Sequence, residues 1–255
     1  MTSPRRFRPH LRAAAVAVVA ACAVAGCALV EADDDVLVVN DDVPPPLPTI
    51  GLGSDTGEGG VISGSAEVRA IDTGEIESLV MIGDSITVGS QPSLQELFTT
   101  LGFDDVAIVA QTSKRTAVGS SENPSGVVLA DFLDGEDDLD ADQRLWVVAL
   151  GTNDIGQYDG VEPMEEAVRE LLAEIPDDAP VVWINAYFRD RPDGTAEVNA
   201  AIENVLTERG NAALGRWDLV APGDGVLRSD GVHPNQDGAV IFADLVARTV
   251  VDFVG

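Results

Sequence analysis

Short apolar runs alternate with longer amphipathic segments from about Glu77 to the C-terminus. A strand that is covered on both faces is apolar throughout, so continuous runs of strand length predict buried strands. These runs are residues 79–82, 106–109, 145–150 and 180–184, with 217–220 as a short last candidate. Helical spacing marks residues 93–101, 126–133, 162–175, 195–209 and 236–251. The alternation predicts a parallel sheet with helices on both faces, which is a three-layer α/β/α domain.

The residues before this domain have a different composition. They contain an acidic run at 33–35, the prolines of 44–48 and a glycine-rich stretch at 51–64. Proline favours extended chain, glycine favours flexible chain, and like charges extend it further. We therefore expect a disordered tether over residues 27–76, followed by one domain over 77–255. The alternative is that the tether packs on the domain as an extension.

The N-terminus has the pattern of a targeting signal. Four arginines within residues 1–12 precede an apolar run over residues 13–25, which is shorter than the ~20 residues of an ordinary transmembrane helix. The run ends in Val24-Ala25-Gly26-Cys27, which resembles the lipobox of bacterial lipoproteins. That resemblance implies cleavage of residues 1–26, a lipid on Cys27 and an extracytoplasmic protein anchored to the membrane. A plain secretory signal and a secreted protein are the alternative.

The charge balance excludes some classes of partner. The chain has 15 Lys+Arg against 44 Asp+Glu, a formal net charge of -29, whereas nucleic acids are bound through cationic contacts to phosphate. We expect no nucleic-acid partner. With two cysteines and two histidines in the whole chain, we also expect no metal site and no cofactor. We expect a monomer.

Polar side chains follow the ends of two predicted strands. Gly83-Asp84-Ser85 follows the first, and a serine at a strand-to-helix turn suits a nucleophile, because the helix N-terminus stabilises an oxyanion. Gly151-Thr152-Asn153-Asp154 follows the third, and the Asn153 amide is a donor of the kind that completes an oxyanion hole. Each motif alone is also ordinary helix-cap or turn chemistry.

A third motif supplies a base. Asp230 and His233 are three residues apart before the last predicted helix, so the carboxylate can orient the imidazole while the other ring nitrogen faces a serine. The second histidine of the chain, His10, lies in the signal. If the domain uses Ser–His chemistry, His233 is therefore its base. The alternative is a histidine on a surface loop.

Taken together and in this order, the three motifs resemble the SGNH (GDSL-type) hydrolase family over about residues 77–255. The resemblance implies a flavodoxin-like sheet of about five parallel strands. It implies Ser85 as nucleophile, His233 as general base and Asp230 as the residue that orients it. The Ser85 N–H and the Asn153 side chain would be oxyanion donors.

One family element departs from the pattern. The family places a glycine after the second strand, whose N–H is a third oxyanion donor, and Ser113 stands in that place here. A backbone N–H does not require glycine, so Ser113 is the candidate for the third donor. The adjacent cations Lys114 and Arg115 are either a solvated pair or a site for an anionic or sugar-rich substrate.

These residues predict a serine esterase that acts on carboxylic esters, such as acyl or acetyl groups on cell-envelope glycans or lipids. Two alternatives remain. One is an O-acyltransferase that uses the same site with an alcohol in place of water. The other is a surface lipoprotein that binds glycan without catalysis.

Overall fold

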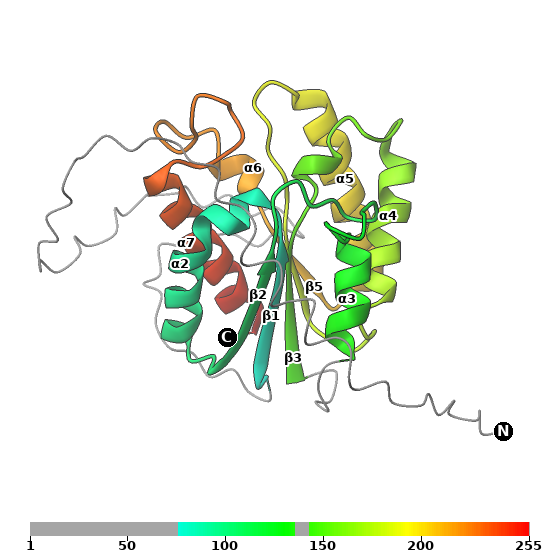
Figure 1. The fold of residues 1–255 in the computed structure, drawn as a ribbon, viewed down its shortest axis with the longest axis vertical. Coiled ribbons are helices and arrows are strands. Elements are labelled where there is room, and N and C mark those ends of the chain that lie inside the picture. The colour runs from blue at the N-terminus through cyan, green and yellow to red at the C-terminus, as the bar shows by residue number, and fades with distance from the viewer. Residues whose placement is uncertain (1–75, 136–142, 255) are drawn as a thin grey trace, which may run out of the picture. The chain divides into compact units, whose positions relative to one another are not determined.

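The computed structural model describes residues 76–135 and 143–254. Within them lies a sheet of five parallel strands (Figure 1). The strands are β1 (Ser78–Gly83), β2 (Asp105–Ala110), β3 (Arg144–Ala149), β4 (Val181–Ile184) and β5 (Ala212–Gly215). Their order is β2-β1-β3-β4-β5, which is the flavodoxin-like order. The prediction of a three-layer, flavodoxin-like α/β/α domain is confirmed.

Helices cover both faces of this sheet (Figure 1). One face carries α2 (Ser85–Leu101), α6 (Trp217–Val220) and α7 (Gln236–Val254), and the other carries α3 (Gly126–Asp134), α4 (Val161–Ala173) and α5 (Pro192–Arg209). Leu79 and Met81 of β1 pack into the apolar cluster under the first group, and Val80 and Ile82 into the cluster under the second. Successive side chains of a strand point to opposite faces, so two helix layers require the continuous apolar runs seen in the sequence.

The prediction of a last strand at 217–220 is wrong. The fifth strand is Ala212–Gly215, and Trp217–Val220 forms the short helix α6. Ala and Gly have low strand propensity, so β5 lacks the bulky pattern that marks the other strands. Trp217 instead packs edge-on against Phe242 of α7, with ring centroids 5.1 Å apart. Tertiary packing therefore decides the conformation of this segment.

Helix α2 begins earlier than its apolar spacing predicts, at Ser85 rather than Ser93. The segment between them contains Gly89 and Pro92, which are usual signs of a turn. The helix nevertheless continues through Pro92, and its capping residue is Asp84. Ser85 is consequently the first residue of a helix rather than part of a loop.

This topology brings the carboxyl ends of β1 and β3 side by side, since the two strands are direct neighbours. In open α/β sheets, ligands bind at such a point, where the strand order reverses. The signal over 1–26, the tether over 27–76 and Cys27 lie outside the described residues. Among the helices that are described, none is both long and apolar enough to cross a membrane.

Candidate active site

The turn from β1 to α2 fixes the position of Ser85. Asp84 is the N-cap of α2, and its Oδ1 accepts a hydrogen bond from the Ile86 N–H at 2.9 Å. The first N–H groups of a helix have no partner within the helix, and they lie at the positive end of its dipole. The Ser85 N–H belongs to this group, so the same residue presents a hydroxyl and a backbone donor.

The loop over residues 221–235, between α6 and α7, carries Asp230 and His233. The Arg228 N–H donates to the His233 carbonyl at 2.8 Å, and Leu227 and Pro234 form an antiparallel bridge that closes the loop. Gly231 lies inside the loop at φ 72°, where a side chain would be strained and its Cβ would lie 2.8 Å from the Arg189 Cβ. The loop thus depends on a glycine at this position.

The structure brings Ser85, His233 and Asp230 together. Ser85 Oγ lies 3.0 Å from His233 Nε2, although the two residues are 148 positions apart. His233 Nδ1 lies 3.0 Å from Asp230 Oδ2. Such a chain can pass a proton from the hydroxyl to the imidazole while the carboxylate fixes the ring.

Asp230 is suited to remain ionised beside the imidazole. Partial burial works against its charge, but hydrogen bonds from the Val232 and His233 N–H groups, both 2.9 Å, and from the His233 ring outweigh it. The net effect lowers the pKa of Asp230 to about 2. The carboxylate is therefore charged throughout the range in which an imidazole acts as a base.

Ser113 occupies the segment between β2 and α3 in a conformation typical of glycine. Its φ is 59°, and it is the one residue other than glycine with positive φ among those described. A residue with a Cβ in the left-handed region costs on the order of 1–3 kcal/mol, which the surrounding structure must offset. The backbone here therefore holds a serine in a conformation that glycine takes without strain.

Asn153 connects the segments that carry Ser85 and Ser113. It belongs to a single 3-10 turn, η2 (Thr152–Asp154), which is separated from the end of β3 by two residues. Its Nδ2 donates to Asp84 Oδ2 at 3.2 Å and to the Lys114 carbonyl at 3.1 Å. The amide therefore lies between the neighbours of both serines, and each of its two N–H groups already has an acceptor.

The two cations after Ser113 are neither a solvated pair nor free to bind an anion together. Lys114 is 1% exposed, and its Nζ donates to Asn123 Oδ1 and the Pro124 carbonyl. Arg115 Nε forms an ion pair with the buried Asp154 at 3.2 Å. The Thr116 N–H and hydroxyl also donate to Asp154, so this carboxylate braces the segment.

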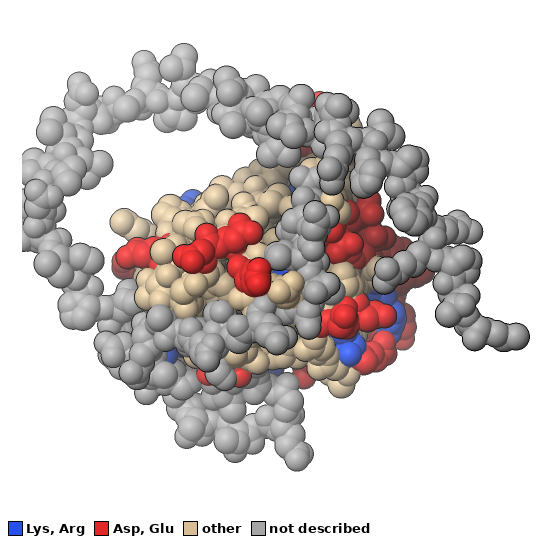
Figure 2. Space-filling model, turned by 90° about the horizontal axis from the view of Figure 1, so that it is seen from below, with Lys and Arg blue, Asp and Glu red and all other residues tan. Residues whose placement is uncertain are grey.

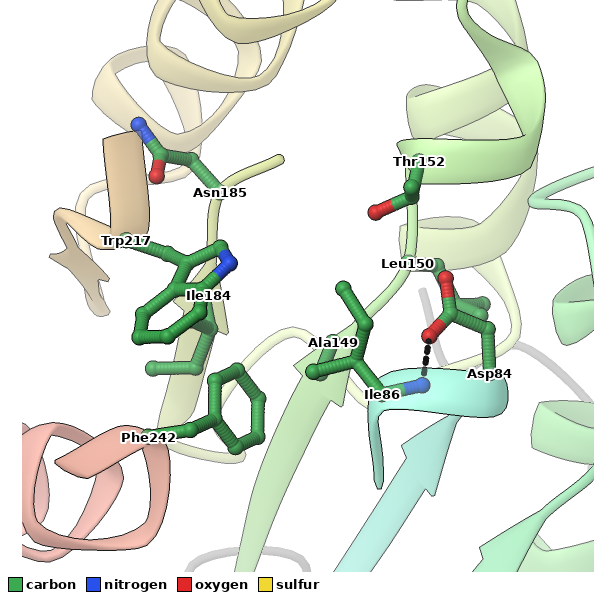
Figure 3. A pocket seen from close by; sticks show the side chains of 9 residues that line it. All are labelled: Asp84, Ile86, Ala149, Leu150, Thr152, Ile184, Asn185, Trp217 and Phe242. Atoms are coloured by element: carbon green, nitrogen blue, oxygen red, sulfur yellow. Dashed lines mark hydrogen bonds between the residues drawn. The ribbon is translucent and has the colours of Figure 1, made fainter. Parts of the chain in front are cut away.

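The Gly83-Asp84-Ser85 motif is compatible with a helix cap at Asp84, but nothing in the sequence indicates that this carboxyl is buried. It is 1% exposed, and burial, partly offset by its hydrogen bond from Ile86 and by the nearby His233, raises its pKa to about 7. A small pocket beside it is also lined by Thr152, Asn185 and Trp217 (Figure 3). The indole nitrogen of Trp217 points into this pocket and has no hydrogen-bond partner among the described residues. Asp84 therefore lies at the edge of a pocket whose lining is mostly apolar, which fits the raised pKa of its carboxyl.

The comparisons with known proteins identify the family of this domain. The model of the GDSL-like Lipase/Acylhydrolase family matches residues 81–241. The matched range runs from β1 into α7, so it includes the segments of Ser85, Asn153 and His233. No curated protein matches the chain.

Several solved structures share the fold. The C-terminal catalytic domain of Streptococcus pneumoniae peptidoglycan O-acetyltransferase A (OatA) is 18% identical, covers 71% of this chain and 93% of its own, and has a TM-score of 0.50. TesA is 19% identical, covers 68% of this chain and 98% of its own, and has a TM-score of 0.54. The psychrotrophic esterase EstA from Pseudoalteromonas sp. is 15% identical, covers 69% of this chain and 97% of its own, and has a TM-score of 0.52. At these identities the likeness is one of fold.

Proposed function

The chain belongs to the GDSL-like lipase/acylhydrolase family of hydrolases, and from this premise we propose that it is a serine esterase with Ser85 as its nucleophile. One observation carries the proposal: Ser85 Oγ, the His233 ring and the Asp230 carboxylate are linked in series, with 3.0 Å at both steps. The His233 side chain is 39% exposed, so water and substrate can reach the base.

In the proposed reaction, His233 takes the Ser85 proton while Oγ attacks the ester carbonyl carbon. The tetrahedral intermediate collapses to an acyl-enzyme, and the imidazolium gives its proton to the departing alcohol. Water then attacks the acyl-enzyme with His233 as base and releases the acid. The His233 Nδ1–H donates a hydrogen bond to the Asp230 carboxylate, which fixes the tautomer of the ring. Nε2 is therefore the nitrogen that exchanges protons with Ser85.

Three donors would bind the oxyanion: the backbone N–H groups of Ser85 and Ser113 and the side chain of Asn153. The hydrogen bonds from Asn153 Nδ2 to Asp84 and to the Lys114 carbonyl support this grouping, because Asp84 precedes Ser85 and Lys114 follows Ser113. Both N–H groups of Asn153 have acceptors, so we expect it to share one of them with the substrate oxygen. Loss of one such donor typically costs about 10²–10³ in kcat.

The N-terminal sequence suggests where this enzyme acts. We expect a lipid on Cys27 to anchor it outside the cytoplasm, with a secreted form as the alternative. Acyl or acetyl esters on glycans or lipids of the cell envelope are then the substrates within reach. In cell fractionation, we expect the wild type in the membrane fraction and the C27A variant in the soluble fraction. If the wild type and C27A were distributed between the two fractions in the same way, the lipid anchor would be contradicted.

The nucleophile and base are tested by S85A and H233A with p-nitrophenyl acetate as the ester. Each variant should lose about 10⁴-fold in kcat, since neither proton transfer nor attack can be replaced by a neighbour. S93A, which removes a hydroxyl from the middle of α2, is the matched control and should retain activity. A fluorophosphonate probe should label the wild type and S93A at Ser85 but not S85A. Turnover of S85A or H233A at the wild-type level would refute the assignment.

A second candidate function is O-acyl transfer at the same site. The fold shared with a peptidoglycan O-acetyltransferase favours it, because the acyl-enzyme can react with a sugar hydroxyl as well as with water. Products formed from p-nitrophenyl acetate in the presence of a soluble glycan fragment separate the two. Free acetate alone supports the esterase, and an acetylated glycan that disappears in S85A supports the transferase.

A further inference from the structure

The conformation of Ser113 needs a cause outside Ser113 itself. It is the third residue of a turn that the Lys114 N–H closes on the Gln111 carbonyl at 3.3 Å, and its φ is 59°. Glycine is the residue that takes such a position without strain. A serine stays there only where its neighbours are held on both sides.

One side is held by Lys114. Its side chain is buried, and Nζ donates to Asn123 Oδ1 at 3.1 Å and to the Pro124 carbonyl at 2.6 Å. Neither acceptor carries a charge, so the ammonium is held by neutral oxygens, and burial lowers the pKa of Lys114. Lysine is rarely buried in this way without a partner of opposite charge, which points to a specific role.

The other side is held by Asn123. Its Nδ2 donates to the Thr112 carbonyl at 3.0 Å, so one asparagine side chain ties down the residues before and after Ser113. Asn123 is itself fixed by Ser120, which receives a bond from the Asn123 N–H at 3.1 Å and donates its own N–H to the Asn123 carbonyl at 2.9 Å.

We propose that Lys114 and Asn123 form a clamp that holds the Ser113 N–H in position as an oxyanion donor. In this clamp both are positioning residues that act through Ser113 and do not touch the substrate. The Lys114 carbonyl also accepts from Asn153 Nδ2, so the clamp couples two of the three proposed donors. The inference rests on the proposed esterase function, and it explains how this chain manages without the family's glycine.

Two single variants test the clamp in the full-length protein. N123A removes both side-chain bonds, and K114M removes the ammonium while keeping most of the buried stem. For p-nitrophenyl acetate, kcat should fall about 10- to 100-fold, and KM should change less than about threefold, because ground-state binding is not touched. N211A is the matched control, since Asn211 also donates from its side chain to a backbone carbonyl, that of Asp178, at 2.9 Å, but lies before β5. The N211A variant should keep the kcat and the KM of the wild type.

A double-mutant cycle separates positioning from general stability. Glycine accepts positive φ without strain, so the clamp matters less in an S113G background. N123A should then lower kcat by less than about threefold, against at least about tenfold with Ser113 present. Equal losses in the two backgrounds would overturn the proposal, because a variant that only weakens the fold would act equally in both.

Amide hydrogen exchange gives a readout that needs no catalysis. Mass spectrometry measures the exchange rate of the backbone amide hydrogens of residues 111–116. This rate should be at least about tenfold faster in N123A than in the wild type, and unchanged in N211A. If S85A retains full turnover, the esterase assignment fails while this measurement still decides the clamp. If S85A is inactive but N123A leaves both kcat and exchange at wild-type values, the clamp alone is wrong.

Discussion

Asp84 shows how a capping residue becomes a titrating group once it is buried. Its two oxygens accept from the Ile86 N–H and from Asn153 Nδ2, and its side chain has almost no contact with water. Burial raises its pKa from 3.8 to about 7. Between these values the folded protein holds a proton that the unfolded chain releases. The free energy of unfolding therefore decreases as pH rises through this interval.

The substitution D84N tests this linkage, because asparagine caps a helix nearly as well and does not titrate in this range. We expect the loss of unfolding free energy between pH 4 and pH 8 to be smaller in D84N than in the wild type, by up to about 4 kcal/mol. Urea denaturation at both pH values measures it. Asp154 also has a pKa raised by burial, and its charge contributes to the raised pKa of Asp84, so the comparison with D84N measures the titration of Asp84 together with its coupling to Asp154. Identical pH dependence in the two proteins would contradict a buried, titrating Asp84.

Asp230 makes the opposite electrostatic contribution, because its pKa is lowered to about 2. Its proposed role is to fix the tautomer and the orientation of the imidazole. D230N keeps the shape but can present an N–H to His233 Nδ1, so we expect kcat to fall on the order of 10²- to 10⁴-fold with the fold intact. Steady-state kinetics with near-UV circular dichroism as the folding control measures this. Retention of wild-type kcat would remove Asp230 from the site.

Which site residues could be predicted depends on how local their chemistry is. Ser85 and Asn153 directly follow strands, and Asp230 reaches His233 across three residues, so spacing alone suggests their roles. The partner of Lys114 lies nine positions away in an irregular segment, and no periodicity connects them. For that reason the sequence predicted either a solvated pair or a substrate site for Lys114 and Arg115, whereas the fold buries Lys114.

At the scale of elements, the loop between α6 and α7 holds Asp230 and His233, the two residues proposed to assist Ser85. Gly231 lies at φ 72° with the Arg189 Cβ 2.8 Å from where a Cβ would be, and the Arg189 N–H donates to the Gly231 carbonyl at 3.0 Å. A methyl group at 231 must move either the loop or the Arg189 segment. The relation between Asp230, His233 and Ser85 would change with it.

We therefore expect G231A to lower kcat by more than about tenfold and the free energy of unfolding by about 1–3 kcal/mol. G225A is a matched control, because Gly225 has a similar φ of 74° but no atom lies within 4 Å of the place that a Cβ would take. It should show a comparable backbone strain with activity retained. Equal effects on kcat in the two variants would mean that strain, and not the contact with Arg189, disturbs the site.

A helix or strand could be predicted where its own apolar pattern decides its conformation. It could not be predicted where contacts with other elements decide it. The four strands with bulky apolar runs form as expected, because both faces of the sheet are covered. β5 has a single bulky residue, Leu214, among Ala and Gly, and its strand conformation comes from pairing with β4, with Val182 opposite Ala213. The Trp217 segment has the composition of a strand and becomes a helix, since Trp217 packs against Phe242.

At the scale of the whole molecule, acidic side chains dominate the charge. Figure 2 shows them in several groups on the face seen from below, with few cations between them. The net charge of the chain is -29, and several described cations are already engaged, such as Arg115 with Asp154 and Arg216 with Asp218. The long-range field of the molecule therefore repels anions and favours neutral or cationic substrates.

This field predicts a salt effect that depends on substrate charge. The kcat/KM for an anionic ester, p-nitrophenyl hemisuccinate, should rise several-fold between about 0.01 M and 1 M salt, since the screening length falls from about 30 Å to about 3 Å. The neutral p-nitrophenyl acetate is the control, and its kcat/KM should change little. The ratio of the two responses isolates electrostatics from the intrinsic reactivity of each ester. If salt instead slowed the anionic ester, a local positive potential at the site would outweigh the acidic surface, and the prediction would be wrong.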